Sequence, residues 1–184
     1  MSISYTYRPS ALEKEKTYTL EQQQFTIKQS ERVDTVKYAE IKGIRLYYAP
    51  SQFADNNYHC DITLKNGANT LIKSVHYIAP AEFEDRGEAY KEFVSAMHAC
   101  LVDYGNIAFT SGNKAGCFSL NIIITVASAI FVGWALSYFA EATDLELVID
   151  VFIFIGMLYA GLKYLKKNRP KKYSPANIPP EMLP

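Results

Sequence analysis

Residues 115–140 lack charge altogether. This stretch, AGCFSLNIIITVASAIFVGWALSYFA, contains no Asp, Glu, Lys or Arg and is rich in Ile, Val, Phe, Leu and Ala. At a helical rise of about 1.5 Å per residue it is long enough to cross an apolar layer of about 30 Å. A buried helix of a soluble bundle normally keeps a polar face, and this stretch has none. The absence of charge therefore predicts a transmembrane helix over residues 115–140.

Other absences exclude several classes of function. The chain has 3 cysteines, a small and odd number that does not indicate a disulfide framework. Its 3 histidines have no Cys or His at metal-ligand spacing, and no glycine-rich phosphate loop is present. The 19 basic and 19 acidic residues cancel, so no overall field favours nucleic acid. We expect no catalytic residue, no metal, no cofactor and no nucleic-acid partner, and therefore not an enzyme.

A second apolar run, residues 147–165, follows a bend at residues 141–146. The bend has three acidic residues and no cation, whereas Lys114 precedes the first run and a basic run ends the second. Because cytoplasmic flanks of membrane helices carry an excess of Lys and Arg, we expect both termini in the cytoplasm. The basic run should attract anionic lipid headgroups at the membrane surface. It consists of Lys163, Lys166, Lys167, Arg169, Lys171 and Lys172.

Small residues recur every four positions on both predicted membrane helices. The positions are Ala129, Gly133 and Ser137 on the first helix, and Gly156 and Ala160 on the second. Small side chains at this spacing let two backbones approach closely in lipid, so the helices are expected to pack on each other or on another copy. Ala, Gly and Ser are common in membrane helices, and chance is the competing explanation.

Asp150 is the one ionisable residue that could fall inside the bilayer. Two interpretations are open. Its carboxylate can reach back to water beside Glu146, or it can form an intramembrane polar site together with Asn121 on the first helix. The second interpretation points to a small channel or transporter component.

Residues 17–73 follow the pattern of short strands. YHCDITLK, residues 58–65, alternates apolar and polar side chains, and KNG at residues 65–67 predicts a tight turn. QFTIKQ and DTVKY predict a hairpin whose inward residues are Phe25, Ile27 and Val36. One amphipathic helix follows, with Asp85 as its expected N-cap. The acidic stretch 82–88 is either the solvated entrance of this helix or a surface for a basic partner. His98 on this helix is expected to be partly exposed.

The string TYTLEQQQFTIKQSERVDTVKYAEIKGIRLYY, residues 17–48, resembles bacterial pleckstrin-homology-like (PH-like) domains of membrane proteins. The resemblance covers residues 18–104 and implies a seven-strand bent sheet or half-open barrel closed by a C-terminal helix. Residues 74–79 are the expected seventh strand. The bacterial members look like protein-interaction and assembly modules, which implies the same class of function here.

The last eleven residues, SPANIPPEMLP, contain four prolines with apolar residues between them. Proline excludes a regular helix and favours an extended chain. A merely flexible end would need no apolar side chains, so the tail is either a docking peptide for a neighbouring domain or subunit, or a plain flexible end. The docking candidates are Ile178, Pro179, Pro180, Met182 and Leu183.

These observations predict an α+β protein: an N-terminal PH-like antiparallel β-barrel or sandwich capped by one C-terminal α-helix, followed by a transmembrane α-helical hairpin. The predicted segments are 1–16, an N-terminal segment; 17–105, the cytosolic domain; 106–114, a linker; 115–140, the first membrane helix; 141–146, the bend; 147–165, the second; and 166–184, the cytosolic tail. We predict a multi-pass protein of a bacterial inner membrane that acts as a scaffold or adaptor. Its predicted partners are membrane lipids and a protein partner or a second copy.

Overall fold

The computed structural model describes residues 3–51, 54, 56–138 and 144–184, and within the helices it leaves aside the side chains of residues 115, 136–138 and 144–150. The chain divides into two compact units. Unit 1 comprises Met1–Gly112 together with Lys171–Pro184, and unit 2 comprises Asn113–Pro170. Unit 2 is therefore an insertion in the sequence of unit 1.

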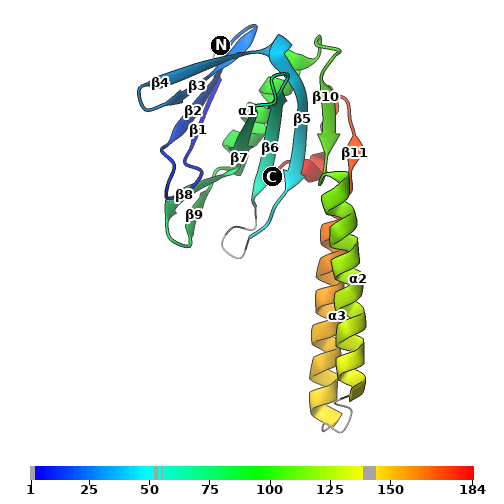
Figure 1. The fold of residues 1–184 in the computed structure, drawn as a ribbon. Coiled ribbons are helices and arrows are strands. Elements are labelled where there is room, and N and C mark those ends of the chain that lie inside the picture. Colours follow the sequence, from blue (N-terminus) through cyan, green and yellow to red (C-terminus); the bar gives the residue numbers. More distant parts are fainter. Residues whose placement is uncertain (1–2, 52–53, 55, 139–143) are drawn as a thin grey trace. The chain divides into compact units, whose positions relative to one another are not determined.

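The first sheet of unit 1 contains β1 (Ser4–Tyr7), β2 (Lys16–Leu20), β3 (Gln24–Gln29) and β4 (Arg32–Lys37), in this order and all antiparallel (Figure 1). Apolar residues on one face are buried, as the alternation requires. They include Tyr5, Tyr7, Tyr18, Phe25 and Val36. The predicted β3–β4 hairpin is confirmed, with Ile27 partly buried against the core.

The second sheet has the order β11 (Lys171–Lys172), β10 (Ala108–Ser111), β5 (Ile41–Tyr48), β6 (Tyr58–Leu64), β7 (Asn69–Lys73). All neighbours are antiparallel except β10 and β5, which run parallel. The alternation predicted for β6 is confirmed, because Tyr58, Cys60, Ile62 and Leu64 are buried. Gly67 has φ of 88°, the left-handed conformation that the predicted tight turn between β6 and β7 needs.

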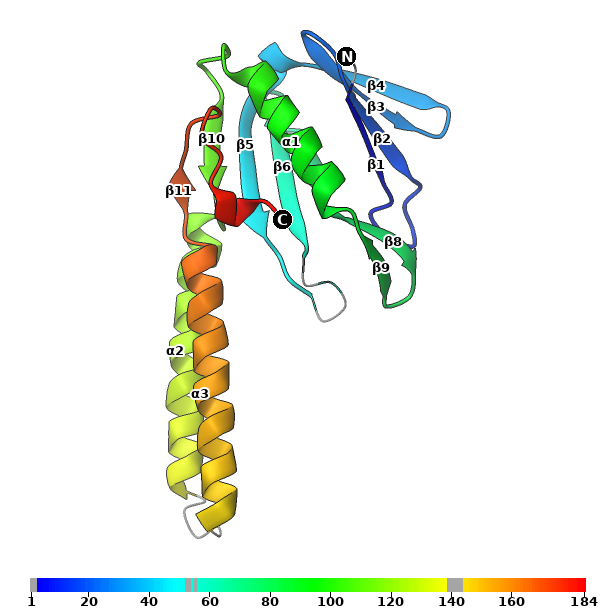
Figure 2. The same cartoon turned by 180° about the vertical axis from the view of Figure 1, so that it is seen from behind.

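Helix α1 (Gly87–Leu101) follows the small sheet of β8 (Val75–Ala79) and β9 (Glu82–Asp85). It lies beside the core face of the second sheet (Figure 2) and buries Tyr90, Phe93 and Met97, as its periodicity predicted. The N-cap residue of α1 is Arg86, so the expectation that Asp85 occupies this position is wrong by one residue. The Asp85 carboxylate still accepts a hydrogen bond from the Gly87 N–H at 2.8 Å, which satisfies one free amide of the first turn. Residues Glu82–Asp85 of the acidic stretch form strand β9, so this part of the stretch is not a helix entrance.

The strands described here do not close into a barrel, so a barrel is wrong, whereas an α+β fold with antiparallel sheets is confirmed. The expected seventh strand forms as β8, but it pairs with β9 in a separate sheet. The open edge of β7 faces tyrosine hydroxyls in place of another strand. Tyr5 donates to the Lys73 carbonyl at 2.6 Å, and Tyr7 and Tyr18 both donate to the Leu71 carbonyl. Side-chain hydrogen bonds thus replace the backbone ladder that a closed barrel would have.

Unit 1 extends beyond the expected domain 17–105 at both ends. Strand β1 comes from the expected N-terminal segment, β10 from the expected linker and β11 from the expected tail. All three strands are short, and β10 and β11 have partners far along the chain, so a sequence window gives little signal for them.

Unit 2 contains α2 (Ala115–Tyr138) and α3 (Asp144–Lys167), which lie side by side. At one end of the pair, the Asn113 N–H donates to the Asn168 carbonyl at 2.9 Å, and the Asn113 side-chain amide donates to the Tyr164 hydroxyl at 3.1 Å. Within the described residues, one segment is long and apolar enough to cross a membrane by length and composition: Gly116–Ala135, with a mean hydropathy of 2.0 and none of its residues buried. The second expected span lies in α3 and stays a prediction.

Candidate functional site

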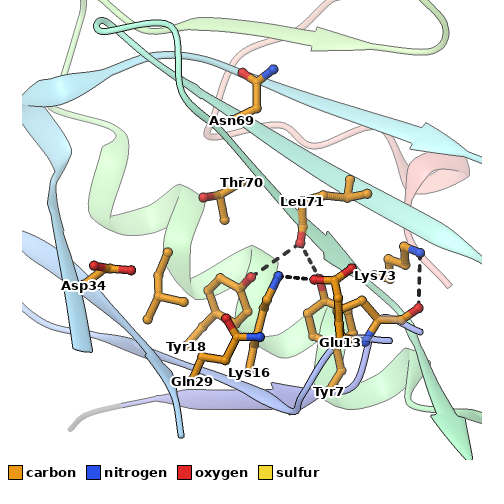
Figure 3. A pocket seen from close by; sticks show the side chains of 12 residues that line it. Tyr7, Glu13, Lys16, Tyr18, Gln29, Asp34, Asn69, Thr70, Leu71 and Lys73 are labelled. Atoms are coloured by element: carbon orange, nitrogen blue, oxygen red, sulfur yellow. Dashed lines mark hydrogen bonds and ion pairs between the residues drawn. The ribbon is translucent and has the colours of Figure 1, made fainter. Parts of the chain in front are cut away.

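A polar cleft opens in unit 1 between the first sheet and the edge of β7 (Figure 3). Its volume is about 340 Å³, at the small end of the range for ligand pockets. One wall comes from β1 to β4 and the segment between β1 and β2, and the other from β7. We call it the inter-sheet cleft. Its lining residues are Tyr7, Pro9, Glu13, Lys16, Tyr18, Ile27, Gln29, Asp34, Asn69, Thr70, Leu71 and Lys73.

Polar residues occupy inward positions of the first sheet at this cleft. Asp34 pairs with Ile27, which pairs in turn with Tyr18, so these side chains share one face of the sheet. Lys16 pairs with Tyr7 in the same way. A sheet whose inward face is otherwise apolar normally excludes such groups, and their presence keeps this part of the space between the sheets open to solvent.

The cleft contains two cations and two anions, but these groups differ in how closely they are paired. The Lys16 ammonium lies 2.5 Å from a Glu13 carboxylate oxygen, so these two groups satisfy each other. Asp34 pairs with Arg32 at 2.8 Å, but the Arg32 side chain is 77% exposed and the pair is correspondingly weak. Lys73 is half-buried, and its ammonium contacts the Pro9 carbonyl at 3.5 Å; among the described residues no carboxylate lies within ion-pair distance of it. Burial lowers the pKa of Lys73.

The tyrosines of the cleft act as neutral hydrogen-bond donors. Burial raises the pKa of Tyr18 to about 12 and raises that of Tyr7 further, so both hydroxyls keep their protons at neutral pH. Both donate to the Leu71 carbonyl, as Figure 3 shows. They fix the distance between the two walls. The Gln29 amide donates only a long hydrogen bond, to the Lys14 carbonyl at 3.5 Å, and Thr70 lines the cleft beside it.

The C-terminal tail packs into unit 1. Met182 is buried, and Ile178 and Leu183 are partly buried against the core. Pro179 precedes the 3₁₀ turn Pro180–Met182 and is half-buried, while Pro180 is exposed. A Cβ placed on Gly87 would lie only 2.8 Å from Cβ of Pro184, so the end of the tail lies against the start of α1. The tail residues therefore lie on the domain of their own chain.

His98 joins the tail to α1 and is fully buried, so its expected partial exposure is wrong. Its Nδ1 donates to the Val94 carbonyl at 2.7 Å, which leaves Nε2 to accept from the Tyr173 hydroxyl at 2.8 Å in the neutral ring. Phe109 and Tyr173 both pack against the imidazole, with ring centroids 5.4 and 5.8 Å away. This burial lowers the pKa of His98 to about 4. Sequence reasoning missed the pair because 75 residues separate its members.

The basic run divides between the two units. Lys163, Lys166 and Lys167 lie in the last turns of α3, and Arg169 follows them; Lys171 and Lys172 form β11. All are exposed except Lys167, which is half-buried. Lys171 pairs with Glu181 of the tail at 3.3 Å.

Three of the predicted small-residue positions, Gly133, Gly156 and Ala160, lie outside the contact between α2 and α3. A Cβ added to Gly133 or Gly156 would meet nothing within 4 Å, and Ala160 is exposed. Ala129 lines a crevice between the helices, and the side chain of Ser137 lies outside the described residues. The close approach is instead at Gly161, where an added Cβ would lie 3.3 Å from Cγ2 of Thr125.

The predicted intramembrane polar site is described only in part. Asn121 is half-buried on α2, and its carbonyl accepts a hydrogen bond from the Thr125 hydroxyl at 2.8 Å. Asp150 belongs to α3, but its side chain lies outside the described residues. In the part of the chain that the structure describes, no group of three His, Cys, Asp or Glu side chains could hold a metal ion.

The inter-sheet cleft can bind a polar ligand through charged groups, hydroxyls and amides. The sequence signal that could have found it is the presence of Lys16, Gln29 and Asp34 at inward positions of predicted strands. No protein-family model matches this sequence, and no curated protein is similar to it.

Proposed function

We propose that this protein is a membrane-anchored binding and assembly module. In this proposal α2 and α3 form a two-helix anchor, and unit 1 is a PH-like domain at the cytosolic surface of a bacterial inner membrane. The exposed apolar side chains of α2 support the anchor, because a bilayer is the solvent in which such a surface is stable. The succession of β1–β4, β5–β7 and α1 supports the PH-like assignment.

The observation that carries the proposal is the pairing of β10 with β11. Ser111 lies opposite Lys171, and Thr110 opposite Lys172, so the chain leaves unit 1 and returns to it at adjacent points about 5 Å apart. If α2 alone crossed a bilayer, these residues would be about 30 Å apart on opposite sides. A membrane-spanning α2 therefore requires α3 to cross back, which makes two spans with unit 1 on one side.

Charge supports a cytosolic location for that side. Lys114 and the basic run lie at the end of the helix pair that joins unit 1, and such residues favour the cytoplasmic face. Each basic residue close to an anionic surface contributes about 1 kcal/mol of attraction. Membrane lipids are therefore the first partner, and unit 1 stays close to the membrane.

The tail in this proposal is part of its own domain, since it buries Met182 and bonds Tyr173 to His98. Self-association would then use the anchor rather than the tail. The outward positions Gly133, Gly156 and Ala160 are open and would allow a helix of a second copy to approach closely.

Topology is tested by labelling single cysteines in intact cells with a membrane-impermeant thiol reagent. The background carries Cys100→Ser and Cys117→Ser, because Cys60 is buried, Cys100 is partly exposed and Cys117 is exposed. Glu31→Cys on unit 1 should react only after the membrane is opened, whereas Thr143→Cys, between α2 and α3, should react from outside. Reaction of both from the same side, or release of the protein by alkaline carbonate, would refute the two-span anchor.

Self-association is tested by native mass spectrometry of the full chain in mild detergent. We expect a defined oligomer that Gly156→Leu dissociates, while Gly105→Leu, at an open position of unit 1, leaves it intact. A monomer for the unaltered chain would contradict the assembly role and leave an anchored adaptor.

A further inference from the structure

We infer that the inter-sheet cleft binds a short peptide with free termini, its carboxylate at Lys73 and its ammonium at Asp34. This inference concerns unit 1 and does not depend on the membrane anchor or on self-association. It follows from the sign, the pairing and the placement of the charges that line the cleft.

The lining charges exclude a simple anion or cation as the preferred ligand. Lys16 and Lys73 contribute two positive charges, and Glu13 and Asp34 contribute two negative ones. The cleft therefore has no net charge that would attract one sign over the other. Lys16 and Glu13 already neutralise each other at 2.5 Å. What remains is one cation and one anion, which is the complement of a zwitterion.

Lys73 and Asp34 are the two groups with capacity to spare. The Lys73 ammonium is half-buried and contacts the Pro9 carbonyl at 3.5 Å; Glu13 acts on it electrostatically but forms its ion pair with Lys16, so a ligand carboxylate would be the first direct ionic partner of Lys73. Asp34 has a single exposed partner in Arg32, and a carboxylate can accept several hydrogen bonds at once. A ligand ammonium can therefore bind Asp34 without displacing Arg32.

The two groups lie at opposite sides of the cleft in Figure 3, with Tyr18, Gln29 and the Lys16–Glu13 ion pair between them. The β7 wall from Asn69 to Lys73 is about 13 Å long at the rise of a strand. An extended chain of about three residues spans about 10 Å, which fits this length.

The wall between the ends matches a peptide backbone. Gln29 on β3 and Thr70 on β7 carry an amide and a hydroxyl that can donate to and accept from a peptide unit, whereas Asn69 lies on the opposite face of β7 from Thr70. Ile27 gives this wall an apolar side chain for a small residue of the ligand. An uncharged polar ligand would use these groups too, but it would leave Lys73 without a direct ionic partner.

The test is calorimetry on the full chain in lipid nanodiscs, with trialanine, trialanine amide and N-acetyl-trialanine as probes. The amide lacks the carboxylate, and the acetyl form lacks the ammonium. We expect trialanine to bind about tenfold more tightly than either capped form, because each cap removes one charge-assisted contact.

Lys73→Met and Asp34→Asn assign each end of the ligand. Lys73→Met should bind trialanine and trialanine amide equally well, but should still bind N-acetyl-trialanine more weakly than trialanine. Asp34→Asn should bind trialanine and N-acetyl-trialanine equally well, but should still bind the amide more weakly than trialanine. The discrimination that each variant keeps shows that its cleft is folded. Matched controls are Lys37→Met and Asp103→Asn, exposed residues outside the cleft. Absence of trialanine binding, or cap discrimination that neither variant changes, would overturn the inference.

Discussion

Helices α1 and α2 are both rich in apolar residues, but only α1 buries them. In α1, Tyr90 and Met97 are 0% exposed, whereas in α2 Ile130 is 68% and Phe131 64% exposed. The difference follows from pattern, because α1 has an apolar stripe facing the sheets and α2 is apolar on every side. The one neighbouring helix, α3, cannot cover every side of α2, so α2 needs an apolar solvent or further copies around it. The comparison separates a region stabilised by burial from one stabilised by its surroundings.

The largest expected effect is on unit 1, where α1 buries its apolar side chains. Phe93 packs against the rings of Tyr5 and Tyr18, with centroids 5.8 and 6.3 Å away, and is 1% exposed. Phe93→Ala should lower the free energy of unfolding of unit 1 by about 3–5 kcal/mol, because it leaves a cavity. Denaturant unfolding in detergent measures this. Glu92→Ala, on the exposed face of α1, should change stability by less than about 0.5 kcal/mol.

The exposed apolar surface of α2 is tested by introducing a charged side chain. Val126 lies at the middle of the apolar segment and is 53% exposed. Val126→Arg should disfavour membrane insertion by about 3 kcal/mol, measured as the inserted fraction in a translocation assay. Val102→Arg has a similarly exposed position in unit 1 and should have no such effect. Normal insertion and unchanged stability of Val126→Arg would indicate that water or protein surrounds α2.

Acid should weaken unit 1 through its buried histidines. Burial lowers the pKa of His98 and of His59 to about 4, below the value of about 6.5 for an exposed histidine. The unfolded chain therefore binds more protons between these values, so stability is full above about pH 6.5 and falls as the pH drops toward 4. His98→Asn should reduce the slope of unfolding free energy against pH by up to about 1.4 kcal/mol per unit in this window.

The control for this prediction is His76→Asn, because His76 is only half-buried and its pKa is less strongly lowered. A His98→Asn variant with an unchanged slope would mean that the tail contact does not couple to protonation. Chemical denaturation repeated at several pH values gives the slope.

The smallest expected effect is at Asp150. Under the anchor proposal, Asp150→Asn should leave both membrane insertion and the unfolding of unit 1 unchanged, since the carboxylate only reaches back to water. Under the channel alternative, the same change should abolish ion flux into liposomes that contain the purified protein. Flux that depends on Asp150 would therefore replace a passive anchor with a transport pathway.

Local pattern predicted those elements that local interactions fix. The alternation of β6, the tight turn at Gly67 and the apolar stripe of α1 all appear in the structure, because period and turn chemistry act over a few residues. The inter-sheet cleft could have been inferred in part from Lys16, Gln29 and Asp34 at inward positions. Its second wall could not, because Lys73 reaches it only through the arrangement of two sheets.

The position of the C-terminal tail is a second feature that the sequence could predict only in part. Apolar residues among prolines predicted docking or a flexible end, but they did not distinguish a neighbouring subunit from the domain of the same chain. Burial of Met182 and the bond between His98 and Tyr173 depend on where β10 places the returning chain.

The sequence by itself determined the uncharged run of α2, the segregation of charge and the strand-then-helix order, because composition and periodicity are properties of neighbouring residues. Only the tertiary structure decided that β10 pairs with β11, that tyrosine hydroxyls cap the edge of β7 and that His98 is buried. Each of these depends on groups brought together across 53 or more residues by a shared core, and such contacts have no local signature.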